Sequence, residues 1–231
     1  MTFNIVRQKF AFLRNLEDLF GDLYAANWCH PFPRHTNLHQ FIYSIVDSIL
    51  FEDPVGENEN PALLEFCKRY HIDTSELDWE DEDSLHEMRL WADYDDAMLA
   101  LSDEVFHVLF HDVIFCSDFN WMMANYILSY GESAGGADDR FTRQGTLKRV
   151  SVPVFVKDAI YHRDKGECRT CKVRLDRNIS ITNKEFYDHI VPLAQGGTND
   201  LTNLQLLCFT CNSTKGASSV GVSNLYPAAF R

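Results

Sequence analysis

The sequence predicts an α+β protein, with an all-helical N-terminal domain followed by a small C-terminal domain of mixed structure. Residues 1–130 carry nonpolar side chains at the three- and four-residue spacing of amphipathic helices. After residue 150, short strand-like runs and turns alternate instead. Charge divides in the same way, since residues 1–140 hold 8 basic and 27 acidic residues and residues 141–231 hold 13 and 7. The basic C-terminal part is therefore the part suited to an anionic partner.

The helices of the first part can be placed from their nonpolar stripes and their capping residues. Ser, Thr, Asp and Asn favour the N-cap position, and proline favours the first helical turn. We expect helices over residues 3–27, after Thr36, from Asn60-Pro61 to Tyr70, over residues 83–101, and from Ser102 to about Tyr130. These helices make up the expected domain 1–130.

A stretch rich in glycine and small polar residues, 131–150, is predicted to be a linker. The C-terminal domain, 151–231, opens with a short helix that begins at Ser151-Val-Pro and ends near His162. Strands and turns follow, and the last helix is expected to begin near Asn203. The order corresponds to a compact β-β-α unit with a leading helix.

Seven cysteines divide into two groups. Four of them form the C-x-x-C pairs Cys168/Cys171 and Cys208/Cys211, which is metal-site spacing. Four thiolates close a tetrahedral zinc site and leave no open coordination position, so this zinc is expected to be structural. The other three, Cys29, Cys67 and Cys116, stand among nonpolar neighbours and are interpreted as buried thiols.

Three polar residues lie between and beside the cysteine pairs. Asp188 and His189 are adjacent on a predicted strand, and Asn212 follows the last cysteine. Carboxylate and amide oxygens are hard ligands that suit Mg²⁺ or Mn²⁺. A histidine can accept a proton from water near neutral pH. Hydrolysis of a phosphodiester needs a base and a cation at the phosphate, so these residues favour that reaction.

Residues 160–217 resemble the HNH branch of the His-Me finger nucleases, which have a ββα-metal fold. The resemblance is carried by the following residues: Asp188-His189, Asn203, Cys208-x-x-Cys211-Asn212-x-x-Lys215-Gly216, and the upstream pair Cys168-x-x-Cys171. The last position of the motif is commonly histidine and is asparagine here. Zinc-stapled relatives that resolve branched DNA, and RNA-guided nucleases, also use asparagine at this position.

The resemblance implies a role for each motif residue. His189 would be the general base, and Asp188 and Asn212 would hold a single catalytic Mg²⁺ or Mn²⁺. Asn203 would fix the loop between the strands and so orient His189. Lys215 would face a phosphate. The motif therefore implies an endonuclease with a structural zinc and a separate catalytic metal ion.

DNA is the partner that the resemblance favours, and RNA stays open as an alternative. Arg163 and Arg174, beside the first cysteine pair, are candidates for contacts with the nucleic-acid backbone. Family members of this size often belong to bacterial or phage defence systems. The alternative function is a nuclease-like zinc module that binds nucleic acid, or a partner ATPase, without cutting. A homodimer is a further alternative.

The acidic run between Glu76 and Glu87 is most simply a solvated loop and helix start. Two sharper alternatives are that the acidic domain covers the basic nuclease surface or binds a basic protein. His107 and His111, four residues apart among nonpolar neighbours, are interpreted as packed or half-exposed rather than as metal ligands. We find no secretory signal and no apolar run long enough to cross a membrane, so a cytoplasmic protein with reduced thiols is expected.

Overall fold

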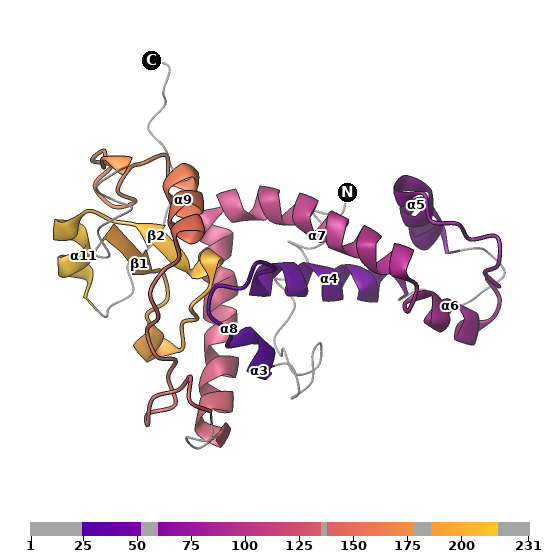
Figure 1. The fold of residues 1–231 in the computed structure, drawn as a ribbon, viewed down its shortest axis with the longest axis horizontal. Helices are drawn as coiled ribbons and strands as arrows, with labels where there is room; N and C mark the ends of the chain where they lie inside the picture. The colour runs from indigo at the N-terminus through magenta and orange to yellow at the C-terminus, as the bar shows by residue number, and fades with distance from the viewer. Residues whose placement is uncertain (1–24, 52–59, 135–137, 178–185, 217–231) are drawn as a thin grey trace, which may run out of the picture. The chain divides into compact units, whose positions relative to one another are not determined.

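The computed structural model describes residues 25–51, 60–134, 138–177 and 186–216 (Figure 1). Most of these residues are helical, and two short antiparallel strands pair in the C-terminal part. The predicted α+β class is confirmed. Contacts divide the chain into two compact units; among the described residues, the first holds 39–51 and 60–107, and the second holds 25–38, 108–134, 138–177 and 186–216.

The first unit is helical. It contains α5 (Pro61–Tyr70), α6 (Glu82–Met88) and most of α4 (Asn37–Leu50) and α7 (Ala92–His111). Asn60 caps α5 as predicted, since its side-chain oxygen accepts hydrogen bonds from the N–H groups of Ala62 and Leu63. The carboxylate of Asp47 accepts a hydrogen bond from the hydroxyl of Tyr94 at 2.7 Å and forms an ion pair with Arg89 at 3.1 Å, which joins α4 to the start of α7 and to the end of α6.

Two predicted helix boundaries in this part of the chain are wrong. The expected helix over 83–101 is broken by a turn after Met88, and α7 then runs through Ser102 to His111. Ser102 does not cap a helix because its hydroxyl donates to the carbonyl of Met98 inside α7. The break comes instead at Asp112, whose carboxylate accepts from the N–H of Phe115 at 2.9 Å and caps α8 (Val113–Ala134).

The second unit builds its small sheet from β1 (Tyr187–His189) and β2 (Leu204–Leu206). The register pairs Asp188 with Gln205. The unit also contains α3 (Ala25–Trp28), α8, α9 (Val154–Arg163), two short 3-10 turns, η3 (Leu193–Gln195) and η4 (Leu201–Asn203), and α11 (Phe209–Lys215). The helix expected to begin near Asn203 is wrong, because Leu204 and Leu206 enter the sheet and the helix starts only after its N-cap, Cys208.

The predicted linker packs closely on the second unit where it is described. Helix α8 continues through Gly131, and a Cβ atom there would lie 2.1 Å from the carbonyl oxygen of Gly145. Arg140 pairs with Asp138 and donates to the carbonyl of Ala26 at 2.7 Å, which ties this segment to α3. The division at 130 and 150 stays a prediction. The structure describes the chain only from residue 25, so most of the helix expected over residues 3–27 lies outside the described part.

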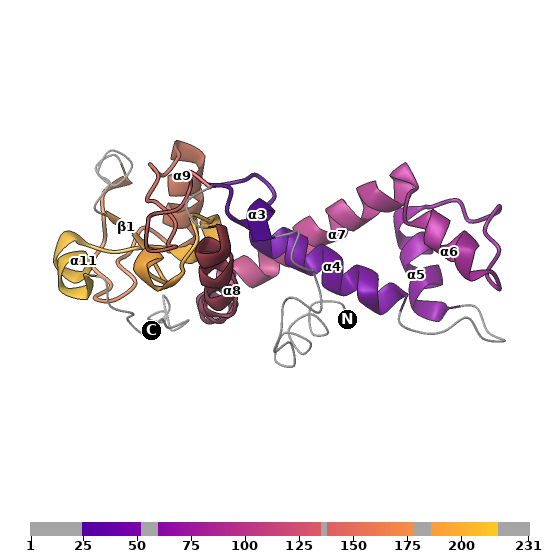
Figure 2. The same ribbon diagram turned by 90° about the horizontal axis from the view of Figure 1, so that it is seen from below.

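The core of the second unit gathers around α8. Helix α3 lies beside α8 (Figures 1 and 2), with the rings of Trp28 and Tyr126 5.4 Å apart. Cys29, Cys67 and Cys116 are buried, as predicted, and burial raises the pKa of the Cys67 thiol to about 11 and those of the other two to about 12. These three thiols are therefore protonated near pH 7.

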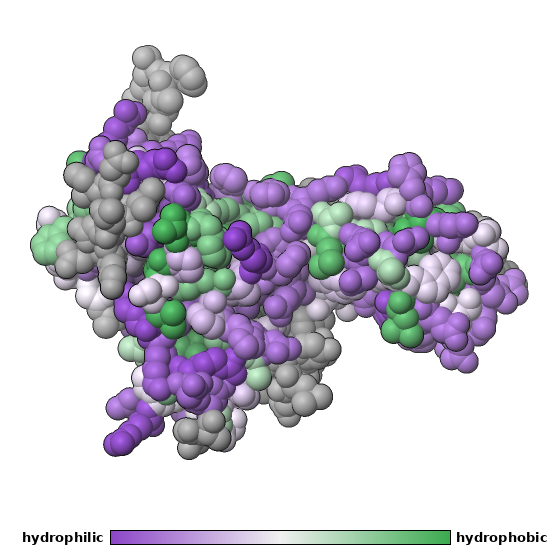
Figure 3. Space-filling model, in the orientation of Figure 1, coloured by the Kyte–Doolittle hydropathy of each residue, from purple (hydrophilic) through white to green (hydrophobic). Residues whose placement is uncertain are grey.

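The surface is largely polar. On the face drawn in Figure 3, hydrophilic residues predominate and nonpolar residues stand among them in small groups. His107 and His111 are exposed, not packed or half-exposed as predicted, and the described residues place no further metal-type ligands with them. Among the helices that the structure describes, none combines the length and nonpolar character that crossing a membrane requires.

Candidate metal centre and active site

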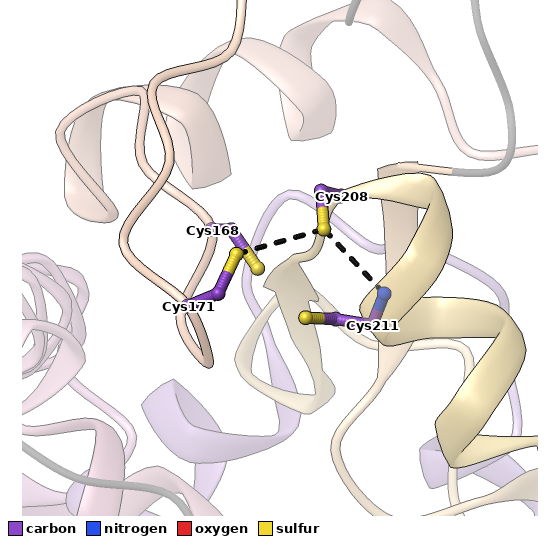
Figure 4. Close-up of side chains that lie close together, drawn as sticks. All are labelled: Cys168, Cys171, Cys208 and Cys211. Atoms are coloured by element: carbon purple, nitrogen blue, oxygen red, sulfur yellow. Dashed lines mark hydrogen bonds between the residues drawn. The ribbon is translucent and has the colours of Figure 1, made fainter.

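The four cysteines of the two C-x-x-C pairs converge in the second unit. Their sulfur atoms all lie within 4.8 Å of one another. Figure 4 shows the four side chains gathered at one place. Cys168 and Cys171 lie on a tight turn that is closed by the bridge between Glu167 and Arg174. Cys208 is the N-cap of α11, and Cys211 lies in the first turn of that helix. The predicted grouping of these cysteines is confirmed.

The sulfur geometry fits a zinc ion. Two sulfurs that each lie about 2.3 Å from a tetrahedral zinc are about 3.8 Å apart, and the sulfurs of Cys171 and Cys208 are 3.7 Å apart. Burial raises the pKa of the Cys168 thiol, but hydrogen bonds from the backbone of Cys171, Cys208 and Thr170 outweigh it and bring that pKa down to about 7. Cys168 is therefore close to the thiolate form, whereas burial raises the pKa of Cys211 to about 12, so that thiol would lose its proton only on binding zinc.

Asp188 lies at the centre of β1, and the structure holds its carboxylate in place. The ammonium of Lys215 lies 2.8 Å from Oδ2, and the amide of Gln205 on β2 reaches the same oxygen at 3.4 Å. Lys215 also donates to the carbonyl oxygen of His189 at 2.9 Å. Helix α11 is thereby fixed against β1 at its last residue as well as through the cysteines at its first turn.

His189 is 1% exposed, and its two ring nitrogens differ in their surroundings. Nε2 lies 3.3 Å from the side-chain oxygen of Asn199. Nδ1 is buried and has no hydrogen-bond partner among the described residues. Burial lowers the pKa of His189 to about 3, and the positive charges of Arg149 and Lys215 act in the same direction. The ring is therefore neutral near pH 7 and offers one unprotonated nitrogen.

Asn203 is fully buried and bonds the loop that follows β1. Its side-chain oxygen accepts from the N–H of Val191 at 2.8 Å, and its amide donates to the carbonyls of Val191 and Thr198. The turn in this loop needs Gly196, which has φ of 86°, and a Cβ there would lie 2.4 Å from the carbonyl oxygen of Ala124 on α8. Asn203 therefore holds the shape of the loop between the strands.

This constellation agrees with what comparison with known proteins finds. Residues 168–218 match the HNH endonuclease family. The HNH region begins at the first cysteine and includes both cysteine pairs, β1, β2 and α11, so the chain carries a nuclease-type region. Comparison of the chain with curated proteins and with solved structures gives no match.

Segments outside the HNH region brace its central loop. The N–H of Phe32 donates to the carbonyl of Asn199 at 2.8 Å, and the N–H of Asn37 donates to the carboxylate of Asp200 at 3.0 Å. From α8, the amide of Asn120 donates to the hydroxyl of Thr202 at 3.1 Å. These bracing residues were missed by sequence analysis, because isolated polar residues in helices and loops carry no spacing signal.

The remaining predicted site residues fall in different environments. Arg163 is 2% exposed, pairs with Asp164 at 2.8 Å and donates to the carbonyl of Leu204, so its guanidinium lies inside the unit rather than on its surface. Arg174 is exposed, with Glu167 3.7 Å away. Lys215 is buried against Asp188. Asn212 is half-buried in the middle of α11, beside Cys211. Their contacts with substrate stay predictions.

Proposed function

We propose that the chain is a metal-dependent endonuclease that hydrolyses phosphodiester bonds in DNA. The observation that carries the proposal is the state of His189, a neutral ring whose Nδ1 is buried without a partner next to the carboxylate-bearing Asp188. Buried polar atoms in proteins are almost always paired. An unpaired basic nitrogen in an HNH region is what a nuclease requires for the water that attacks the phosphate.

His189 would act as the general base. Its Nδ1 would accept the proton of a water molecule as that water attacks phosphorus, while the hydrogen bond to Asn199 holds the ring from the other side. Because burial lowers the pKa of His189 to about 3, the ring is unprotonated throughout the neutral range, and its strength as a base would rise as the site opens to water. Since the side chain is 1% exposed, the site must open for water and the substrate to reach Nδ1.

Asp188 and Asn212 would hold the catalytic ion, since their carboxylate and amide oxygens are the hard donors that Mg²⁺ and Mn²⁺ prefer. Such an ion stabilises negative charge on the phosphate and on the leaving oxygen. The contacts of the Asp188 carboxylate with described residues both end on Oδ2, which leaves Oδ1 for a cation. Lys215, released from Asp188, would be free to face a phosphate.

The zinc would have a different task. Four cysteines close its coordination sphere, so it would tie the turn at Cys168 to α11 and thereby fix Asn212 and Lys215 relative to β1. The net charge of +6 over residues 141–231 favours DNA, with RNA as the alternative substrate. Because a net charge of +6 provides little basic surface for reading a long DNA sequence, we expect the nuclease to have weak sequence preference. We further propose that the acidic helical part serves targeting, through a partner protein such as an ATPase, in a defence system.

The test is nicking of supercoiled plasmid by the purified full chain with Mg²⁺ or Mn²⁺. We expect His189→Ala to lower the nicking rate by at least about 100-fold, because general-base catalysis contributes roughly 10²–10⁴. The matched control is His162→Ala, which removes an exposed histidine on α9 of the same unit. This control should cut at the wild-type rate.

Three outcomes separate the alternatives. Loss of cutting in His189→Ala alone supports the proposal. Equal cutting by both variants would identify a contaminating nuclease and remove His189 as the base. If the wild-type chain shifts labelled DNA in a mobility assay but does not nick it with either metal, the alternative of a binding module that does not cut would replace the proposal.

A further inference from the structure

We propose that Asn199 is a positioning residue that sets the tautomer of His189, so that Nε2 carries the proton and Nδ1 is the basic nitrogen. The consequence for catalysis rests on the proposed nuclease function. The tautomer itself follows from three hydrogen-bond partners in the structure and can be measured without any reaction.

The direction of the Asn199 amide is fixed by its partner on the main chain. Nδ2 of Asn199 lies 2.8 Å from the carbonyl oxygen of Lys148, and a carbonyl oxygen can only accept. The amide therefore presents its NH₂ group to Lys148 and its oxygen to His189, 3.3 Å from Nε2. Because that oxygen is also only an acceptor, Nε2 must donate, and the neutral ring carries its proton on Nε2.

The opposite tautomer would leave two acceptors facing each other. The oxygen of Asn199 would meet an unprotonated Nε2, and the proton would sit on Nδ1, which no described residue accepts. Turning the Asn199 amide over would instead bring its oxygen against the carbonyl oxygen of Lys148. Each arrangement gives up a buried hydrogen bond. We therefore expect the tautomer with its proton on Nε2 to outnumber the other by at least about tenfold.

The partners of Asn199 are themselves held in place. Asn199 is 3% exposed, and its carbonyl accepts from the N–H of Phe32 at 2.8 Å. The N–H of Lys148 donates to the carbonyl of Arg140 at 2.9 Å, and its ammonium donates to that of Asp139 at 2.6 Å. Two segments outside the HNH region, one at Phe32 and one from Asp139 to Lys148, thus hold the main chain of Asn199 and the carbonyl that its amide bonds.

The experiment measures the ring nitrogens of His189 by ¹⁵N NMR of the histidine-labelled full chain at pH 7.5, assigned by comparison with His189→Ala. In the wild type we expect Nε2 at the shift of a protonated ring nitrogen and Nδ1 at that of an unprotonated one. In Asn199→Leu the two shifts should move toward each other as the tautomers mix. Asn199→Asp keeps an oxygen toward Nε2 but sets its second oxygen against the carbonyl oxygen of Lys148, and it should keep the His189 proton on Nε2.

The rate of plasmid nicking is the second readout. Asn199→Leu should lower kcat by about 10- to 100-fold, as loss of a partner behind a functional side chain commonly does, with KM for DNA unchanged. The kcat of Asn199→Asp should lie above that of Asn199→Leu, because the acceptor for Nε2 is kept while the bond to Lys148 is lost. The matched control is Thr198→Val, which removes the loop hydrogen bond to Asn120 at 3.4 Å and leaves the His189 contact intact. It should leave both the ring shifts and kcat within twofold of wild type.

The two readouts keep this inference separate from the proposed function. A wild-type ring protonated on Nδ1, or ring shifts unchanged in Asn199→Leu, would overturn the assignment of Asn199 whether or not the chain cuts DNA. Wild-type kcat in Asn199→Leu would also overturn the positioning role. A chain that cuts nothing but shows the expected ring shifts would refute the nuclease and support the tautomer.

Discussion

Asp200 offers a sharp test of how the loop of the HNH region is held. One carboxylate oxygen accepts the N–H and the hydroxyl of Thr202, each at 2.8 Å, and the other accepts the N–H of Asn37 at 3.0 Å. Asp200 is 1% exposed. In Asp200→Asn the side chain has a single oxygen, so one of the two sides loses its acceptor. The variant is nearly identical in size, and the effect therefore reports hydrogen bonding rather than packing.

The expected loss of stability follows from the hydrogen-bond donor that the variant leaves without an acceptor. A buried donor without a partner costs about 1–3 kcal/mol, and we expect Asp200→Asn to lower the free energy of unfolding by that amount at pH 4. Burial raises the pKa of Asp200 above 3.8. The folded protein therefore keeps a proton on this carboxyl group at pH values where the same group in the unfolded chain has lost it. The stabilisation is complete below pH 3.8 and declines as the pH rises toward the folded pKa. Since asparagine does not titrate, the difference between wild type and variant should shrink at pH 7.5.

The assay is urea unfolding at both pH values, followed by the fluorescence of the tryptophans, of which Trp28 is buried in this unit. The matched control is Asp158→Asn, which breaks a partly exposed ion pair with Arg177 and should cost less than about 1 kcal/mol. A loss below about 0.5 kcal/mol at pH 4, or a difference that grows with pH, would refute the role given to the buried carboxylate.

Three further predictions follow from the same unit. Cys171→Ser should lower the zinc content, measured by mass spectrometry, from one ion per chain, and should also remove the cooperative unfolding of the unit; a Cys67→Ser control, outside the cluster, should keep the metal. Arg163→Met should cost about 3–5 kcal/mol in urea unfolding, because it removes the 2.8 Å ion pair of the buried Asp164 carboxylate and leaves that carboxylate with the more distant Arg169, 4.0 Å away; a loss like that of a surface variant would contradict this. The fragment 141–231 should lack the dispersed amide NMR spectrum of a folded domain even with zinc, since it omits the partners of the HNH loop on α8 and residues 25–38; a well-dispersed spectrum would show that the loop needs no bracing.

The features that sequence alone predicted depend on neighbours in the chain. The two C-x-x-C pairs indicated one four-thiolate site, because two cysteines three residues apart can bind one ion. Asn60 before Pro61 identified the start of α5, since capping is a local interaction. The motif around Asp188 and His189 led to the HNH family for the same reason, as its residues stand at fixed spacings.

Tertiary structure decided what depends on distant partners. Nonpolar spacing continued through Ser102 and Asp112 alike, and only the side-chain hydrogen bonds determined which one ends a helix. Leu204 joins a strand rather than a helix because β1 lies opposite to pair with it. Nothing local distinguishes a buried arginine such as Arg163 from a surface one. The loop of the HNH region is held by hydrogen bonds between residues 82 and 163 positions apart, and no periodicity or motif in a single sequence specifies such pairs.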